Sequence, residues 1–273
     1  MANPYIEETT GTHMFKTVTF LLFSQLAVGG LISIALVPDP AGKRFFRFCG
    51  VCCAILLAAA LSVSSVPFEV AVWLGICLIA TGPFIFLIQQ DQFSIARKAL
   101  VVAAGAGCVG LAANALLVSS PEMPMWVSAA SVVYQISGAA FIGSVIFGMT
   151  LGHWYLIVPT LPIGPLRKLT LLMIVTTGLR TVLLIVVLVL GASSQIPEIA
   201  ATIDSFSRLA GLFFWARTLF GILGPIVICY MTWETVKLNA TQSATGLLYV
   251  ATILVLIGET MSLYLYHSTH LPV

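Results

Sequence analysis

Charged side chains are scarce in this sequence of 273 residues: Asp, Glu, Lys and Arg make up 8%, whereas 59% of the residues are hydrophobic. Water-soluble domains carry roughly a quarter charged residues, so this chain has too few charges to cover a surface that faces water. The composition excludes a soluble protein and predicts one integral membrane domain, residues 1–273, with short loops. The net charge of +2 gives no support for binding to nucleic acid.

Metal-ligating patterns are also lacking. The six cysteines all fall in apolar segments, where cysteine behaves as a small hydrophobic residue. Cys49 and Cys52 form one C-x-x-C, but no second pair and no adjacent histidine completes a zinc, iron–sulfur or c-type haem motif. Of the four histidines, His13, His267 and His270 lie near the chain ends, so a bis-histidine haem b has little support. If the protein takes part in electron transfer, other subunits must carry most of the cofactors.

A removable signal peptide is not expected. Residues 1–16 are polar and lack a basic start, and the apolar run that follows has no small-residue cleavage site. We therefore expect residues 1–16 to form a short arm outside the cytoplasm and the run after it to be a retained first span.

Long apolar runs dominate the rest of the chain. A bilayer core about 30 Å thick needs about 20 helical residues to cross it, and helices satisfy their own backbone hydrogen bonds in lipid. Eight runs meet this requirement, and we place the spans near residues 17–37, 45–65, 68–88, 98–118, 126–151, 169–191, 209–235 and 245–266. The sequence thus predicts an all-α bundle of eight transmembrane helices. It contains no convincing internal repeat of the kind common in transporters.

The basic residues predict an orientation. Most of them lie in or beside the connections after the first, third, fifth and seventh spans: Lys43, Arg44, Arg47, Arg97, Lys98, Arg167, Lys168 and Lys237. The opposite side carries mostly acidic residues with two basic ones: Glu7, Glu8, Lys16, Glu69, Glu122, Glu198, Asp204 and Arg208. By the positive-inside rule, both termini should lie outside the cytoplasm, in a multi-pass protein of the cell's inner membrane.

Three charged residues lie well inside the predicted spans, at least seven residues from either end: Arg180, Arg217 and Glu259. A charge at a helix centre costs roughly 2.5 to 3.5 kcal/mol on insertion scales, so each marks a candidate site. At about 1.5 Å per residue, all three fall in one band in the outer half of the membrane. The simplest pair is Arg217 with Glu259, which leaves one positive charge to face a quinone oxygen, a haem propionate, an anionic substrate or a lipid phosphate.

A purely structural interpretation of these polar residues stays open. Buried ion pairs also fix which helices pack together, and the remaining arginine could reach a carbonyl group or water. Gln25 and Asn114 are mid-span polar residues for which interhelical hydrogen bonding is the simpler interpretation.

A second candidate is the aromatic cluster His153, Trp154 and Tyr155, within the stretch GHWYLIVPTLPIGPLRKL at the predicted cytoplasmic end of the fifth span. Tryptophan and tyrosine commonly anchor helices at the membrane interface, which accounts for Trp154 and Tyr155 without any chemistry. Histidine is the residue type that most often exchanges protons under physiological conditions, so His153 could relay a proton, bond a quinone carbonyl or ligate haem.

Two segments at opposite ends of the chain carry a family resemblance. FLLFSQLAVGG, residues 20–30, resembles the first span of the membrane anchor subunits of dimethyl sulfoxide reductase and its relatives, where a glutamine precedes a small-residue pair. VLIGETMSLYLYHSTHLPV, residues 255–273, is similar to their last span, with Gly258 and Glu259 at the family's Gly-Glu pair and His267 near its terminal histidine. The resemblance implies eight spans, both termini outside, and a subunit that holds a catalytic module on the membrane and exchanges electrons with quinol. The histidine that the family commonly has after the second span is missing from LSVSSVPFE.

These observations favour a non-catalytic anchor subunit of a respiratory or photosynthetic electron-transfer complex. We expect it to bind a quinone near Arg180, Arg217 and Glu259, with His153, Trp154, Tyr155 and Arg167 on a cytoplasmic docking or proton-entry face. Its partners would be the lipid bilayer and the redox subunits of the complex. The alternatives are a small transporter that uses the buried Arg/Glu band and a membrane cytochrome with a single haem b.

Overall fold

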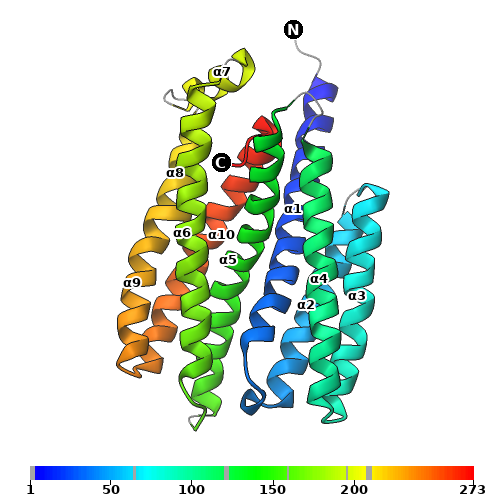
Figure 1. The fold of residues 1–273 in the computed structure, drawn as a ribbon, viewed down its shortest axis with the longest axis vertical. Helices are drawn as coiled ribbons and strands as arrows, with labels where there is room; N and C mark the ends of the chain where they lie inside the picture. The colour runs from blue at the N-terminus through cyan, green and yellow to red at the C-terminus, as the bar shows by residue number, and fades with distance from the viewer. Residues whose placement is uncertain (1–3, 64–65, 120–122, 159, 195, 207–210) are drawn as a thin grey trace.

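The computed structural model describes the whole chain except residues 1–3, 64–65, 120–122, 159, 195 and 207–210. The residues it describes form helices and connecting turns, with no strand among them (Figure 1). Eight of the helices are long and apolar enough to cross a membrane. The prediction of an all-α bundle of eight transmembrane helices is confirmed.

The helices follow one another with short connections. The spanning elements are α1 (Pro4–Leu36), α2 (Lys43–Val63), α3 (Phe68–Gln89), α4 (Phe93–Val118), α5 (Met125–Ile157), α6 (Gly164–Ala192), the composite α8 (Leu212–Thr218), η3 (Leu219–Leu223) and α9 (Gly224–Lys237), and α10 (Thr241–Thr269). The short elements are η1 (Asp39–Ala41) and α7 (Pro197–Ser205).

Most observed helices extend beyond the predicted spans. Hydropathy marks only the part of a helix that lies in hydrocarbon, whereas the helix itself continues through polar residues until a breaker ends it. Helix α6 thus begins at Gly164, with Pro165 in its first turn, and Arg167 and Lys168 lie inside the helix. Likewise, the polar segment predicted as an arm is helical from Pro4 and continuous with the first span.

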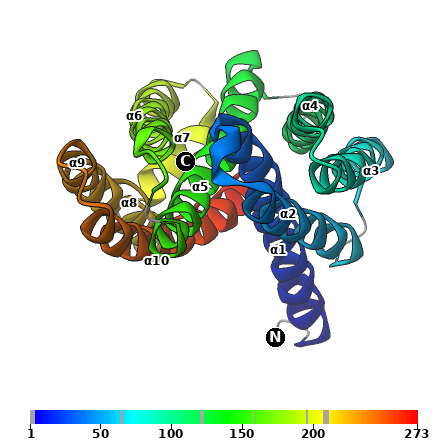
Figure 2. The same ribbon diagram turned by 90° about the horizontal axis from the view of Figure 1, so that it is seen from below.

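Helices α1 and α5 form the centre of the bundle. Their most apolar segments are 67% and 72% buried, against 28–39% for the other six spans. Helices α2, α3 and α4 lie on one side of this central pair, and α6, α8, α9 and α10 lie on the other (Figure 2). Polar groups that the central pair shares with its neighbours are therefore shielded from lipid on both sides.

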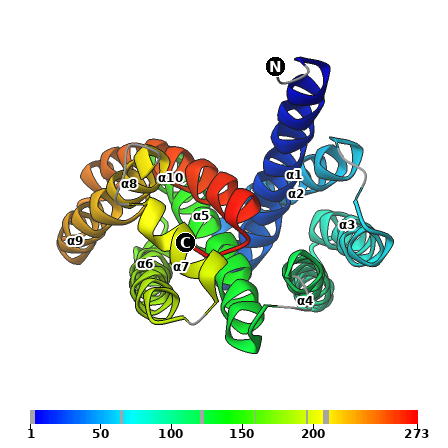
Figure 3. The same ribbon diagram turned by 90° about the horizontal axis from the view of Figure 1, so that it is seen from above.

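A short helix that the sequence did not predict lies at the end of the bundle that carries the termini. The polar connection at 193–207 contains the helix α7, whose Ile199 packs with Phe206 in a small apolar cluster. Leu271 and Val273 belong to the same cluster and are 1% and 0% exposed. The C-terminal residues lie below α7, near α5, α6 and α10 (Figure 3). Two charges used in the orientation argument, Glu122 and Arg208, lie outside the described residues.

Candidate functional site

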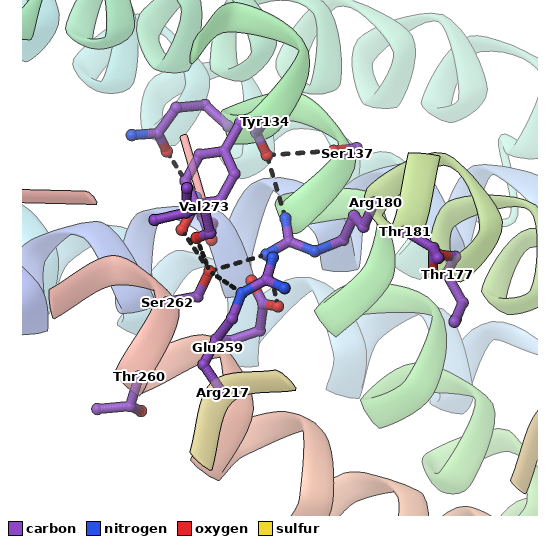
Figure 4. Close-up of polar contacts among 12 residues, drawn as sticks. Tyr134, Ser137, Thr177, Arg180, Thr181, Arg217, Glu259, Thr260, Ser262 and Val273 are labelled. Atoms are coloured by element: carbon purple, nitrogen blue, oxygen red, sulfur yellow. Dashed lines mark hydrogen bonds and ion pairs between the residues drawn. The ribbon is translucent and has the colours of Figure 1, made fainter. Parts of the chain in front are cut away.

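The three buried charges of the sequence converge on one place between α5, α6, α8 and α10 (Figure 4). Arg180 and Arg217 are each 2% exposed and Glu259 is 1% exposed. Arg180 Nη2 lies 2.7 Å from Glu259 Oε1. The structure thus brings together the three charges that the sequence placed in the sixth, seventh and eighth spans.

The ion pair itself differs from the one expected. Glu259 pairs with Arg180, whereas Arg217 donates from Nε to the hydroxyl oxygen of Ser262 at 3.1 Å. No described acidic side chain lies within ion-pair distance of Arg217. The number of charges could not decide this pairing, because the pairing depends on the direction in which each guanidinium group points between the helices. Among its side chains the cluster thus has two cations and one anion, and Arg217 is the cation without a carboxylate side chain as partner.

Ser262, one turn beyond Glu259 on α10, joins the parts of this cluster. Its hydroxyl donates to the main-chain oxygen of Val273 at 2.8 Å and lies 2.8 Å from the Tyr134 hydroxyl. Since a hydroxyl has one proton, Tyr134 must be the donor in the second bond. The Ser262 oxygen then has two lone pairs for three donors, which come from Tyr134, Arg217 and Arg180. The contact with Arg180 Nη2, at 3.3 Å, is the longest of the three and therefore the weakest.

Helix α5 supplies an aromatic wall. The guanidinium of Arg180 lies 4.8 Å from the centre of the Tyr134 ring and donates from Nη1 to the Tyr134 carbonyl at 3.3 Å. The Tyr266 ring packs on the Tyr134 ring at a centroid distance of 5.1 Å. Cation–π attraction and the carbonyl contact lower the cost of holding Arg180 away from water.

Glycines allow the helices to approach closely enough for these contacts. A Cβ atom added at Gly138 of α5 would lie 2.8 Å from Arg180 Nη1, 3.2 Å from Gln25 Oε1 and 3.3 Å from Glu259 Oε2. One added at Gly258 would overlap the backbone of Gly221 in η3. The small residues therefore bring α1, α5, α6 and α10 together around the charges.

Several buried polar atoms of the cluster lack a hydrogen-bond partner among the described residues. They include the donors Arg180 Nε and Arg217 Nη1 and the acceptor Glu259 Oε2. Buried polar groups are normally paired with protein or ordered water, because each unpaired group costs about 1–3 kcal/mol. The cluster consequently retains donors and an acceptor for a further polar molecule.

Other buried polar atoms extend from the cluster towards the end of the bundle that carries the termini. They are Gln25 Oε1, Gln135 Nε2, Ser131 Oγ, Tyr266 Oη and His267 Nδ1, of which the Tyr266 hydroxyl lies close to Ser131 and Gln135. Gln25 donates to Gln135 Oε1 at 2.5 Å, which confirms the interhelical hydrogen bond expected for it. Asn114, 6% exposed, has no partner for its Nδ2 among the described residues.

The helix that carries Arg217 is irregular directly after this residue. Leu219–Leu223 form one turn of π-helix, and Gly224 and Pro225 follow it at the start of α9. Gly221 within this turn meets Gly258 of α10 backbone to backbone. Single π turns often occur at functional sites.

The second candidate, His153 to Tyr155, lies near the opposite end of α5 and does not meet the buried charges. Twenty-one residues separate Tyr134 from Tyr155, or about 30 Å along a helix. Trp154 donates to the Ala41 carbonyl at 3.1 Å, and Tyr155 donates to the Pro162 carbonyl at 2.6 Å. Trp154 thus holds η1 against α5, and Tyr155 holds the segment between α5 and α6 in place. His153 is exposed, with Nδ1 3.5 Å from the Tyr249 hydroxyl.

The histidines near the chain ends also approach one another. The rings of His267 and His270 have centroids 6.4 Å apart. Among the described residues, no group of three or more His, Cys, Asp or Glu side chains is arranged to hold a metal ion.

Two members of the site, Ser262 and Tyr134, were not predicted from the sequence. Both are common residue types in membrane helices, and nothing in the sequence distinguishes Tyr134 from its neighbours. A usable signal was present on α10: Ser262 lies three residues after Glu259 and therefore on the same helix face.

Fold and site together define a multi-pass, all-α membrane protein with a polar, net positive charge cluster buried between its helices. No protein-family model matches this chain, and no curated protein matches it significantly.

Proposed function

We propose that this protein is a membrane subunit of an electron-transfer complex and that it binds a quinone at the Arg180–Arg217–Glu259 cluster. The observation that carries the proposal is the convergence of these three side chains on Ser262, with hydrogen-bonding atoms left over. The unpaired donors and the arginine without a carboxylate partner favour a ligand site over a clamp that serves only to hold helices together.

The chemistry of the unpartnered atoms suits a quinone and its reduced form. Arg217 Nη1 and Arg180 Nε are donors for a carbonyl oxygen of the oxidised ring. Glu259 Oε2 is an acceptor for a hydroxyl of the reduced ring. The excess positive charge also stabilises the oxygen when the ring gains electrons, and it does so strongly because the surroundings are apolar.

A route for protons accompanies this proposal. Quinol oxidation releases two protons with two electrons, and buried polar atoms of Gln25, Gln135, Tyr266 and His267 extend from Glu259 towards the end with the termini. In our proposal, Glu259 accepts the two protons one after the other, and these groups pass each proton outwards before the next is taken up. Electrons leave to redox cofactors on partner subunits, because the described residues offer no metal cluster.

The family resemblance gives a specific form to the complex. Its two motifs lie far apart in the sequence, yet Gln25 of the first and Glu259 of the second both face Gly138. We propose the role of the dimethyl sulfoxide reductase anchor subunits: holding redox subunits on the inner membrane, with both termini extracytoplasmic. The basic loops would then face the cytoplasm, where His153, Trp154, Tyr155 and Arg167 form a docking or proton-entry face.

Quinone content measured after purification tests the proposal. Arg217→Gln removes the excess cation while the Arg180–Glu259 pair stays neutral, so this variant should fold and lose bound quinone. Glu234→Gln is the matched control, because Glu234 pairs with Lys237 at the other end of the bundle. Equal quinone in the wild type and Arg217→Gln would refute the site. A reduced-minus-oxidised spectrum separates this proposal from a haem b subunit, and copurifying redox subunits would support the anchor role.

A small transporter is the second candidate, and the π turn at Leu219–Leu223 favours it. An irregular helix beside a buried charge is a common way for transporters to bind a substrate and change conformation. This alternative predicts that a thiol placed near Arg217 becomes accessible to water-soluble reagents from each side in turn. A quinone site predicts labelling that does not alternate.

A further inference from the structure

An open pocket with a volume of about 760 Å³ lies at the basic end of the bundle, away from the buried charges. It is lined by α2 and the end of α3: Lys43, Arg44, Arg47, Phe48, Val51 and Gln89. The volume falls within the range of about 300–1,000 Å³ typical of sites for small organic molecules. The lining combines three cations with two apolar side chains and contains no acidic residue.

The basic residues of this end differ in whether they are already paired. Lys43 forms an ion pair with Asp91 at 2.8 Å. Arg97 binds Asp39 at 2.6 Å and also donates to the Val37 carbonyl, so it fastens α4 to the end of α1. By contrast, Arg44 and Arg47 are exposed and have neither an ion pair nor a hydrogen bond among the described residues. The pocket thus presents two free guanidinium groups.

The helix that carries them continues as an apolar surface. Arg44, Arg47, Phe48, Val51 and Ile55 follow the three- and four-residue spacing of a single helix face. Phe48, Val51 and Ile55 are 56%, 39% and 62% exposed on α2, which is an apolar helix of membrane-spanning length. One face therefore presents cations at its start and hydrocarbon along its length. This order matches a phospholipid, whose anionic phosphate sits at the membrane surface and whose chains run inwards.

We propose that this pocket binds an anionic phospholipid. Arg44 and Arg47 hold the phosphate, since guanidinium groups match its geometry in pairs of hydrogen bonds. Phe48, Val51 and Ile55 pack against an acyl chain, and Gln89 closes the pocket from α3. The proposal does not depend on the quinone site. It does require this end of the bundle to lie at a leaflet that contains anionic lipid.

Lipid titrations of the purified protein in neutral detergent test the proposal through the thermal unfolding midpoint. Dioleoylphosphatidylglycerol should raise the midpoint, whereas dioleoylphosphatidylcholine should not. In the variant R44Q/R47Q the apparent affinity for phosphatidylglycerol should fall by roughly tenfold or more, because each basic residue near a membrane surface contributes substantially to anionic lipid binding. Both residues are exposed, so the variant should fold.

Matched controls identify the source of the effect. R167Q/K168Q also removes two adjacent basic residues at this end but leaves the pocket intact, and it should keep the full response. Glycerol 3-phosphate, which carries the phosphate without acyl chains, should give no stabilisation at the same concentration. If it stabilises as well as the lipid does, the pocket is a simple anion site and the lipid proposal is wrong. An undiminished lipid response in R44Q/R47Q would also overturn it, and an acidic partner protein would then be the better candidate for these cations.

Discussion

Arg180 and Glu259 form an ion pair with an N–O distance of 2.7 Å, and both side chains are almost completely buried. A pair this deeply buried gains little net stability over apolar residues of similar size, because both ions lose their water. Removing one partner is expensive, however, since the other remains as an uncompensated charge. The presence of Arg217 beside the pair makes the cost depend strongly on which residue is removed.

We predict that Glu259→Gln loses the most stability, Arg180→Gln loses less and Arg217→Gln loses the least. The first leaves two cations without an anion and should cost about 3–5 kcal/mol. The second leaves Arg217 free to pair with Glu259, and the third leaves the observed pair intact. Thermal unfolding in one detergent measures the order. A larger loss in Arg217→Gln than in Glu259→Gln would contradict the charge assignment.

Gly138→Ala should disturb the cluster without changing any charge. The added methyl group would lie 2.8 Å from Arg180 Nη1 and within 3.3 Å of Glu259 Oε2, so the pair must shift. Overpacking of this kind costs about 1–3 kcal/mol. Gly178→Ala is the control, because a Cβ there meets nothing within 4 Å. Bound quinone should decrease in the first variant only.

Gly258→Ala should separate α10 from η3. Its Cβ would overlap the Gly221 backbone, and a backbone cannot yield as a flexible side chain can. We expect a greater loss of stability than in Gly138→Ala, measured by unfolding midpoint and by monodispersity in size-exclusion chromatography. Gly246→Ala, on the same helix and in open space, should behave like the wild type.

Ser262→Ala removes the hydroxyl that four groups share. The donors of Tyr134 and Arg217 and the acceptor of Val273 each lose a partner, and each buried orphan costs about 1–3 kcal/mol. Ser262→Thr keeps the hydroxyl and should retain more stability than Ser262→Ala. If the two variants unfold at the same temperature, the hydroxyl does not organise the site.

Tyr155→Phe should affect stability but not quinone content. It removes one hydrogen bond, to the Pro162 carbonyl, at the end of α5 away from the buried charges. A loss of about 1 kcal/mol is expected, measured by thermal unfolding. His153→Ala, beside it and exposed, should leave both properties unchanged if this segment acts only in docking. Loss of quinone in either variant would contradict the proposed site, because it would show that quinone binds near His153 and Tyr155 and not at the buried charges.

Much of the architecture follows from local sequence. Runs of apolar residues as long as a bilayer is thick must become helices, whatever their neighbours are, because lipid offers no partner for backbone groups. The short helix α7 escaped prediction because Pro197–Ser205 has a mixed polar and apolar composition, and its helical form is stabilised by apolar contacts of Ile199 with the end of the bundle.

The sequence by itself determined the class of protein, the number of spans and the three charges that had to share one depth. It did so because the cost of leaving water is local and depends on residue type and position along a helix. Only the tertiary structure decided that Glu259 pairs with Arg180, that Ser262 and Tyr134 join them, and that Gly138 leaves the space. Those contacts depend on how each helix is rotated about its own axis, and packing between distant segments sets that rotation.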